Sequence, residues 1–477
     1  MRLSSTHWQG PPVGRTEVTA MGRARRGALL VAATIGNVAI LRAPRHSLAS
    51  VVIVLVTATL VGLFVLAEHR RPRLGIVAVS VAITITVAAA VVAPPRTSND
   101  LWSYTMYGRM VTEHGASPYD HTPSDFRHDH FFSQVSPRWR HRASVYGPAF
   151  VGVAALGAWL AGPSTLAARL YFQVLAALAL AAVLVVIWRT TRRVAAVAFL
   201  GLSPVLAVIV VNGGHNDMLI GALILAAALA AARRRPATAG ALVGLAALVK
   251  LTAGLALVGL LLWMWRHHLR RGAVRLLTAT TAVLAAGYLP ILVSASNVLT
   301  RADKTATNAS PWNGIIDRLV RHDAWRNVPN PLAPNDTLVA FFYVGTVAVL
   351  VLAVGIGQRA ARRHRPDEAV GVSLAAYPVA AEYAFPWYAA WALPVFASDG
   401  LSPLGAVVWI QSVVMLAALK LPLPVTGSLE TAVLRLLLTY VAPVAILVAF
   451  VVTGLRRRDA RASAAAGLEV DGPALSA

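Results

Sequence analysis

The sequence contains no cysteine and little charge, and each shortage excludes a class of protein. Without cysteine, no disulfide, thiolate metal site or thiol nucleophile can form. Only 13% of the 477 residues are charged and 57% are hydrophobic, whereas a soluble enzyme of this length needs far more charge to cover its surface. Walker, HExxH and GxSxG motifs are also missing, so the sequence offers no nucleotide or zinc-protease site.

The apolar residues are gathered in long blocks, such as 48–67 and 431–454. A run of about 20 apolar residues spans the hydrocarbon layer as a helix, and the short alternating segments of an outer-membrane barrel are absent. The sequence therefore predicts an all-α, polytopic helical membrane protein with about 12–13 transmembrane helices. The candidate spans are 27–41, 47–67, 74–93, 148–161, 166–187, 194–211, 217–232, 237–249 with 251–265, 273–294, 337–357, 368–384, 386–397, 402–420 and 430–455.

Three of these segments are too short for a full crossing. Residues 148–161, 237–249 and 386–397 are each well below the length that spans a bilayer. Such pieces survive at membrane depth only where they line a cavity. We expect them to be half-helices or re-entrant segments.

The net charge of +23 is carried mainly by arginines in short loops between the blocks. On a soluble domain this charge would suggest nucleic acid, but here it marks cytoplasmic loops of a plasma-membrane protein, and we expect no nucleic-acid partner. The basic segments are residues 1–26, 68–73, 233–235, 266–271, 358–366 and the tail 456–477, which also looks disordered. We expect a retained first span, both termini in the cytoplasm and a transmembrane domain over 27–455.

Alternation then places two long loops, 94–147 and 295–336, outside the cell. The basic loop 188–193 conflicts with this count, and it moves inside only if 148–161 does not fully cross. Loop 94–147 is rich in acidic and aromatic residues, so we expect short amphipathic helices lying on the membrane surface. Its histidines lack the spacing of a zinc site, and metal binding there is a minor alternative.

Asn99 and Asp100 follow the third long block, after Pro94 and Pro95 end that helix. A helix N-cap is the structural explanation, and from this segment alone it is the favoured one. The functional alternative is a general base, since a carboxylate at an apolar boundary can have a raised pKa suited to taking a proton from a hydroxyl.

The turn Gly213-Gly214-His215-Asn216-Asp217 connects two apolar blocks. Glycine lets the backbone turn tightly, and Asp217 could cap the next helix. That explanation does not require His215 or Asn216, and polar side chains at membrane depth are by default a functional site.

Lys250 interrupts an apolar stretch and splits it into two short helices. It is either a lysine that extends to an interface or a cation held in a cavity to meet a phosphate. The segments Ser144-Val145-Tyr146-Gly147-Pro148 and Pro386-Trp387-Tyr388 bring aromatic rings, which belong to interfacial belts in many membrane proteins and also stack on sugar rings.

The ordered set of these motifs resembles the GT-C superfamily of membrane glycosyltransferases, and within it the actinobacterial polyprenyl-phosphate-mannose-dependent α-1,6-mannosyltransferases. The resemblance covers most of the chain. The matching positions are Asp100, Ser103-Tyr104, Gly108, Gly115-Ala116-Ser117-Pro118-Tyr119, Tyr146-Gly147-Pro148, Gly213 to Asp217, Ala246 to Lys250 and Pro386 to Pro394. Many members of the superfamily carry an acidic pair where this chain has Asn99-Asp100.

The resemblance implies an inverting transfer of mannose from polyprenyl-phosphate-mannose to a glycan or glycolipid acceptor at the outer face of the membrane. Asp100 would be the general base, Lys250 and His215 would meet the leaving phosphate, and Asn216 and Asp217 would bind sugar hydroxyls. Substrate-binding aromatics would be Tyr104, Tyr146, Trp387 and Tyr388. The resemblance requires no nucleotide cofactor or obligatory metal.

Two alternatives remain open from the sequence. Another polyprenyl-phosphate sugar, such as arabinose or glucose, could be the donor. A lipid-linked sugar transporter or flippase would also have many spans, but it should show pseudo-repeated halves, and none is found in the sequence.

Overall fold

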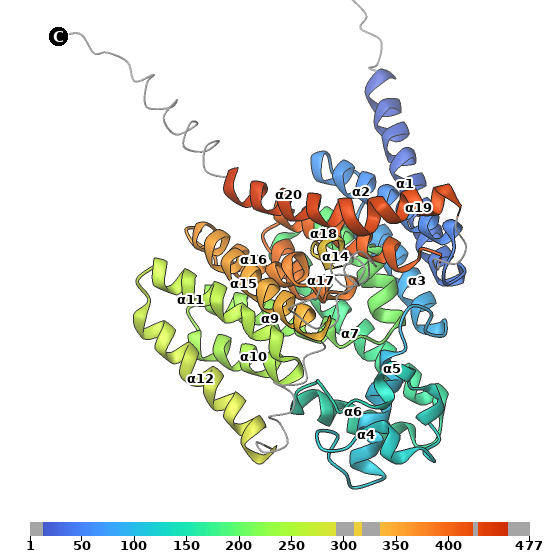
Figure 1. The fold of residues 1–477 in the computed structure, drawn as a ribbon. Coiled ribbons are helices and arrows are strands. Elements are labelled where there is room, and N and C mark those ends of the chain that lie inside the picture. Colours follow the sequence, from blue (N-terminus) through green and yellow to red (C-terminus); the bar gives the residue numbers. More distant parts are fainter. Residues whose placement is uncertain (1–12, 292–309, 317–333, 423–427, 457–477) are drawn as a thin grey trace, which may run out of the picture.

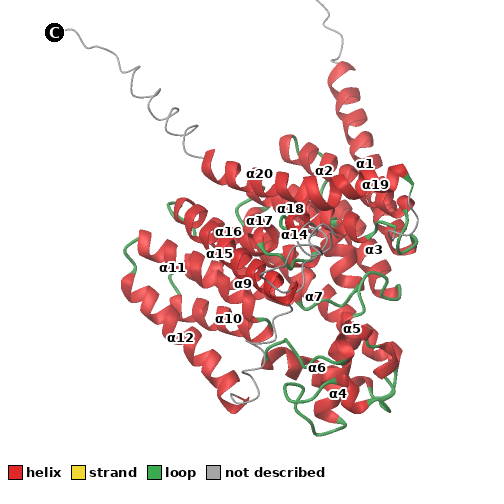
Figure 2. Ribbon diagram, in the orientation of Figure 1, coloured by secondary structure: helices red, strands yellow, loops and turns green. Residues whose placement is uncertain are grey.

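The computed structural model describes residues 13–291, 310–316, 334–422 and 428–456 (Figure 1). Every regular element in these ranges is helical (Figure 2), so the predicted all-α polytopic class is confirmed. The first half holds α1 (Val13–Arg42), α2 (Leu48–Arg70), α3 (Ile76–Val92), α4 (Asp100–Thr112), η1 (Pro123–Phe126), η2 (Phe132–Gln134), α5 (Pro137–Arg140), α6 (Pro148–Ala161), α7 (Thr165–Thr191), α8 (Val194–Gly201), η3 (Pro204–Val210) and α9 (Asp217–Ala232).

The second half contains the remaining helices of the described ranges. They are α10 (Pro236–Val249), η4 (Leu251–Leu255), α11 (Ala256–Arg266), α12 (Arg270–Tyr288), η5 (Leu289–Ile291), α14 (Asn313–Ile316), α15 (Pro334–Ala360), α16 (Asp367–Ala380), η8 (Pro386–Tyr388), α17 (Ala389–Ala397), α18 (Pro403–Leu419), α19 (Leu429–Arg435), η9 (Leu436–Val441) and α20 (Ala442–Arg456). Residues 1–12, 457–477 and most of loop 295–336 lie outside the described residues, so the expectations for them stay predictions.

In the part of the chain that the structure describes, six helices are long and apolar enough to cross a membrane. They are Met21–Arg42, Leu48–Arg70, Thr165–Thr191, Arg270–Ile291, Phe342–Ala360 and Leu429–Leu455. Six further apolar helices are shorter, and the short segments predicted at 148–161 and 237–249 are among them. The break predicted at Lys250 is present, because α10 ends at Val249 and Lys250 has an extended backbone before η4.

The arginine-rich loops contact one another in separate groups. Arg26 pairs with Glu68 at 2.7 Å, and His267 Nε2 contacts the Arg363 carbonyl at 2.8 Å. Arg189 lines one hollow together with Arg233 and Arg235. Loop 188–193 thus lies beside loop 233–235, and the sidedness of both loops stays a prediction.

Helices α4 and α6 lie at the opposite side of the molecule from the first turns of α1 (Figure 1). They pack closely, because a β-carbon at Gly108 would lie only 2.2 Å from the Ala154 carbonyl oxygen. Short helices were predicted in loop 94–147 and are present, but α4 is buried around most of its circumference instead of on one face. Its burial fixes the position of Asp100, its first residue.

Candidate active site

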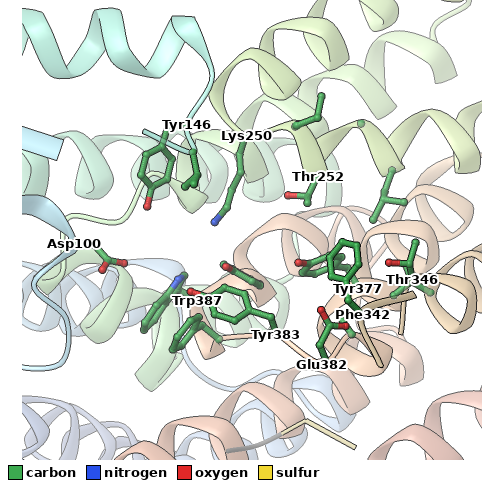
Figure 3. A pocket seen from close by; sticks show the side chains of 18 of the residues that line it. Asp100, Tyr146, Lys250, Thr252, Phe342, Thr346, Tyr377, Glu382, Tyr383 and Trp387 are labelled. Atoms are coloured by element: carbon green, nitrogen blue, oxygen red, sulfur yellow. The ribbon is translucent and has the colours of Figure 1, made fainter. Parts of the chain in front are cut away.

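A cavity of about 630 Å³ opens where segments distant in sequence converge (Figure 3). Asp100 and Tyr146 come from one side, Lys250 and Thr252 from the break between α10 and α11, and Phe342 from α15. The segment from Glu382 to Tyr388 completes the wall, with Glu382, Tyr383, Phe385, Trp387 and Tyr388 lining it. The cavity therefore combines an apolar wall with a few converging polar groups, which is the usual composition of a small-molecule site.

Asp100 is the first residue of α4, but its carboxylate does not cap the helix. Asn99 stands at the N-cap without a side-chain capping bond, and the Asp100 backbone N–H donates to Ser98 Oγ at 3.1 Å. The side chain is 20% exposed, and Oδ2 lies 3.6 Å from His215 Nδ1. Burial raises the pKa of Asp100 to about 6, which suits a base near neutral pH.

The turn at Gly213 presents His215 directly behind Asp100. Gly214 has φ +59°, and a β-carbon at Gly213 would collide with the imidazole, so both glycines are required by the geometry. The ring stacks on Trp387 at 4.1 Å with 18° between planes. Burial, followed by the nearby Lys250 charge, lowers the pKa of His215 to about 3, so this side chain is neutral at physiological pH.

Asp217 is the first residue of α9 and is fully buried. Its Oδ1 accepts a hydrogen bond from Trp391 Nε1 at 2.8 Å and lies 3.2 Å from Lys250 Nζ. Asn216 at the N-cap makes no side-chain capping bond. The capping explanation of Asp217 is therefore replaced by a more specific one: the carboxylate anchors Lys250.

Lys250 is held between this carboxylate and two aromatic faces. Its Nζ lies 4.1 Å from the centroid of Tyr388 and 5.1 Å from that of Trp391, and those rings stack at 4.5 Å. Cation–π contact and the ion pair together fix the ammonium group. The side chain retains 15% exposure, which leaves it a face toward the cavity (Figure 3).

The predicted site residues form two groups. Five of them line the cavity: Asp100, Tyr146, Lys250, Trp387 and Tyr388. Three others lie behind them. His215 contacts Asp100 and Trp387. Asp217 pairs with Lys250, and the Tyr104 ring contacts that of Tyr146. Asn216 is 2% exposed, and neither polar atom of its amide has a hydrogen-bond partner among the described residues.

Sequence reasoning missed Arg138 and Glu382, which also line the cavity. The Arg138 guanidinium lies 5.8 Å from the centroid of the Tyr383 ring, and burial raises the pKa of Glu382 to about 7. Glu382 did carry a signal, because it is the lone charged residue in the apolar stretch 369–397. Within the described segments, no group of three His, Asp or Glu side chains could hold a metal ion.

The residues that line this cavity can remove a proton from one group and stabilise an anion on another. A carboxylate of raised pKa faces one end of the cavity, and a fixed ammonium group lies in the same wall. The neutral imidazole can offer a hydrogen bond but no positive charge, so the role predicted for His215 at a phosphate would be that of a hydrogen-bond donor.

Comparisons with known proteins identify a family that the chain resembles. A family model described as "Alpha-(1->6)-mannopyranosyltransferase, N-terminal domain" matches residues 14–267, just over half of the chain. Over 336 residues the chain is 26% identical to alpha-(1->6)-mannopyranosyltransferase A of Mycobacterium tuberculosis, covering 66% of this chain and 63% of that protein. It is 25% identical over 187 residues to alpha-(1->6)-mannopyranosyltransferase A of Corynebacterium glutamicum, covering 38% of each chain. The matched part thus spans less than two thirds of these relatives.

Proposed function

The chain belongs to the alpha-(1->6)-mannopyranosyltransferase family, and from this premise and the site we propose that it is a mannosyltransferase that uses a polyprenyl-phosphate-linked donor. The acceptor is a glycan or glycolipid hydroxyl, and the anomeric centre is inverted. The reaction takes place at the face opposite the arginine-rich loops, which is the outer face of the plasma membrane if those loops are cytoplasmic.

The observation that carries the proposal is the shared cavity of Asp100 and Lys250. A glycosyl transfer needs a base for the acceptor hydroxyl and a group that stabilises the departing phosphate. Both line one cavity, and Lys250 is held by its ion pair with Asp217. The phosphate leaves as an anion, so no general acid is required.

In the proposed reaction, Asp100 takes the proton of the acceptor hydroxyl as that oxygen attacks C1 of the mannosyl group. The C1–O bond to the phosphate breaks on the other face of the sugar, which inverts the configuration. Lys250 stabilises the charge that develops on the phosphate. Tyr146, Trp387 and Tyr388 offer aromatic faces to the sugar ring.

The apolar wall of the cavity supports a lipid-linked donor. Phe342, Val349 and Leu350 line it from α15, and Leu255 and Val258 from the facing segment. Helix α15 belongs to the candidate membrane spans, so a polyprenyl chain could reach the site along it from the bilayer. A soluble sugar nucleotide has no long apolar chain that could pack against this wall.

The test is a comparison of donors in membranes that contain the full chain. We expect transfer of labelled mannose from polyprenyl-phosphate-mannose to short α-mannosides, and none from a mannose nucleotide when lipid-linked donor synthesis is blocked. NMR of the product should show the anomeric configuration opposite to that of the donor. Transfer from the nucleotide alone would contradict the proposed donor, and failure with every polyprenyl-linked sugar would favour a transporter.

A further inference from the structure

A second cavity, of about 240 Å³, lies beside the first. The two share Thr97, Asp100, Trp139 and Leu419 as lining residues, so they meet at the Asp100 carboxylate. The second cavity differs in character, because its wall brings together the basic side chains of Arg45, Arg96 and Lys420.

Lys420 is the central member of this group. It follows α18, is only 3% exposed, and its Nζ donates to Thr97 Oγ1 at 3.2 Å. Burial, followed by the neighbouring Arg45 and Arg96 charges, lowers the pKa of Lys420 to about 8. Both arginines are therefore close enough to repel Lys420.

The backbone holds these cations in place. The Ser47 N–H donates to the Lys420 carbonyl at 3.0 Å, which ties the segment of Arg45 to the end of α18. The Arg96 N–H donates to Asn212 Oδ1 at 3.0 Å, which ties Arg96 to the turn that carries His215. These bonds fix the backbone from which the three side chains reach the second cavity.

No carboxylate of the described segments lies within 4.0 Å of any of these three cations. Lys250 and Arg26, by contrast, each pair with an acid. Lys420 is buried, whereas Arg45 and Arg96 are exposed. A buried cation without a counter-charge is costly, and repulsion from the two arginines adds to that cost. The arrangement is explained if an anion is part of the bound state.

We propose that Arg45, Arg96 and Lys420 bind an anionic group of the acceptor, a phosphate or phosphodiester in its lipid anchor. This deepens the proposed function and rests on it. In an inverting displacement the nucleophile and the leaving group lie on opposite sides of C1. Two cavities that meet at the base, each with its own cation, match that requirement: Lys250 serves the donor phosphate and the second cluster serves the acceptor.

The experiment compares two acceptors that differ only in the anionic group. One is an alkyl mannobioside, and the other is the same mannobiose joined to its lipid through a glycerol phosphodiester. For Lys420→Met we expect KM for the phosphodiester acceptor to rise about tenfold or more, as for loss of a charge-assisted hydrogen bond. KM for the neutral acceptor and for the donor should stay unchanged, and Lys420→Arg should restore most of the loss.

The matched control is Arg233→Gln, which removes an exposed charge on the opposite face and should alter neither acceptor. An equal loss with both acceptors, or a rise in donor KM, would overturn the inference, and the second result would assign the cluster to the donor phosphate. No change with either acceptor would also overturn it.

A binding measurement separates this failure from failure of the proposed function. Calorimetry of octyl phosphate with the purified full chain measures binding without any mannosyl transfer. We expect Lys420→Met to bind octyl phosphate more weakly than the wild type and Arg233→Gln do. Equal affinity in the three proteins would overturn the anion site. Absence of transfer in wild type with retained, Lys420-dependent binding would overturn the proposed reaction and not the anion site.

Discussion

Lys250 Nζ lies 3.2 Å from Asp217 Oδ1, and the same oxygen accepts a hydrogen bond from Trp391 Nε1 at 2.8 Å. These residues come from three separate segments of the chain, and Lys250 also makes a cation–π contact with the Trp391 ring. The charge of Lys250 is thereby fixed in position before any substrate binds. A fixed charge stabilises a developing anion without reorganisation during the reaction.

Replacing Asp217 with asparagine should release Lys250. We expect kcat/KM to fall about 30-fold or more, since loss of one partner of a buried charge pair costs about 2–5 kcal/mol. Transfer kinetics on the two single variants and the double variant with Lys250→Met measure the coupling. The double variant should be little worse than Lys250→Met alone, whereas additive losses would show that Asp217 acts independently.

Gly147 should not tolerate a β-carbon. Its N–H donates to the Val249 carbonyl at 3.1 Å, and a β-carbon there would lie 2.2 Å from the Leu248 carbonyl oxygen. Gly147→Ala should displace the turn at Lys250, lower transfer and destabilise the protein by about 1–3 kcal/mol. Gly152→Ala in α6 is the control, because nothing lies within 4 Å of its added carbon. Equal melting temperatures and activities for the two would contradict the close approach.

Transfer should depend on pH through Asp100. The base acts as a carboxylate, so activity is lost as pH falls through the raised pKa of about 6 and is retained above it. Well below this value kcat/KM should fall about tenfold per pH unit. Because the Ser98 hydrogen bond lowers the pKa of Asp100, Ser98→Ala should move the midpoint upward. A profile that Ser98→Ala leaves in place would argue that another group titrates.

The absence of cysteine makes the sidedness of the loops directly measurable. Single cysteines in place of Arg192 and Arg233 should react with a membrane-impermeant maleimide from the same side, and a cysteine in place of Ser124 from the other. The positive-inside rule predicts that the first pair is cytoplasmic. Labelling of positions 192 and 233 from opposite sides would contradict the packing of the two loops.

Local sequence signals predicted much of the fold. Apolar block lengths gave the helices, and the break at Lys250 followed from one lysine in an apolar run. The proximity of loop 188–193 to loop 233–235 was not predictable, because the hollow shared by Arg189 and Arg233 joins residues from different helices. Sequence spacing carries no information on such contacts.

The same limit applies to the site. Asp100, His215 and Lys250 were singled out from motifs, but their individual partners were not predictable. For Asp217 the sequence predicted a helix cap or a contact with sugar hydroxyls, and neither interpretation indicates its pairing with Lys250 and Trp391. Lys420 lies at the end of an ordinary apolar helix, and only the fold brings it beside Arg45 and Arg96.

The most direct test of the account is transfer of labelled mannose from polyprenyl-phosphate-mannose by wild type and by Asp100→Asn, in membranes that contain equal amounts of folded protein. Asparagine keeps the shape of the side chain but cannot take the proton. We predict transfer by the wild type and a loss of at least about a hundredfold in the variant. Full activity in Asp100→Asn would contradict the assignment of the base and leave Asp100 a structural residue.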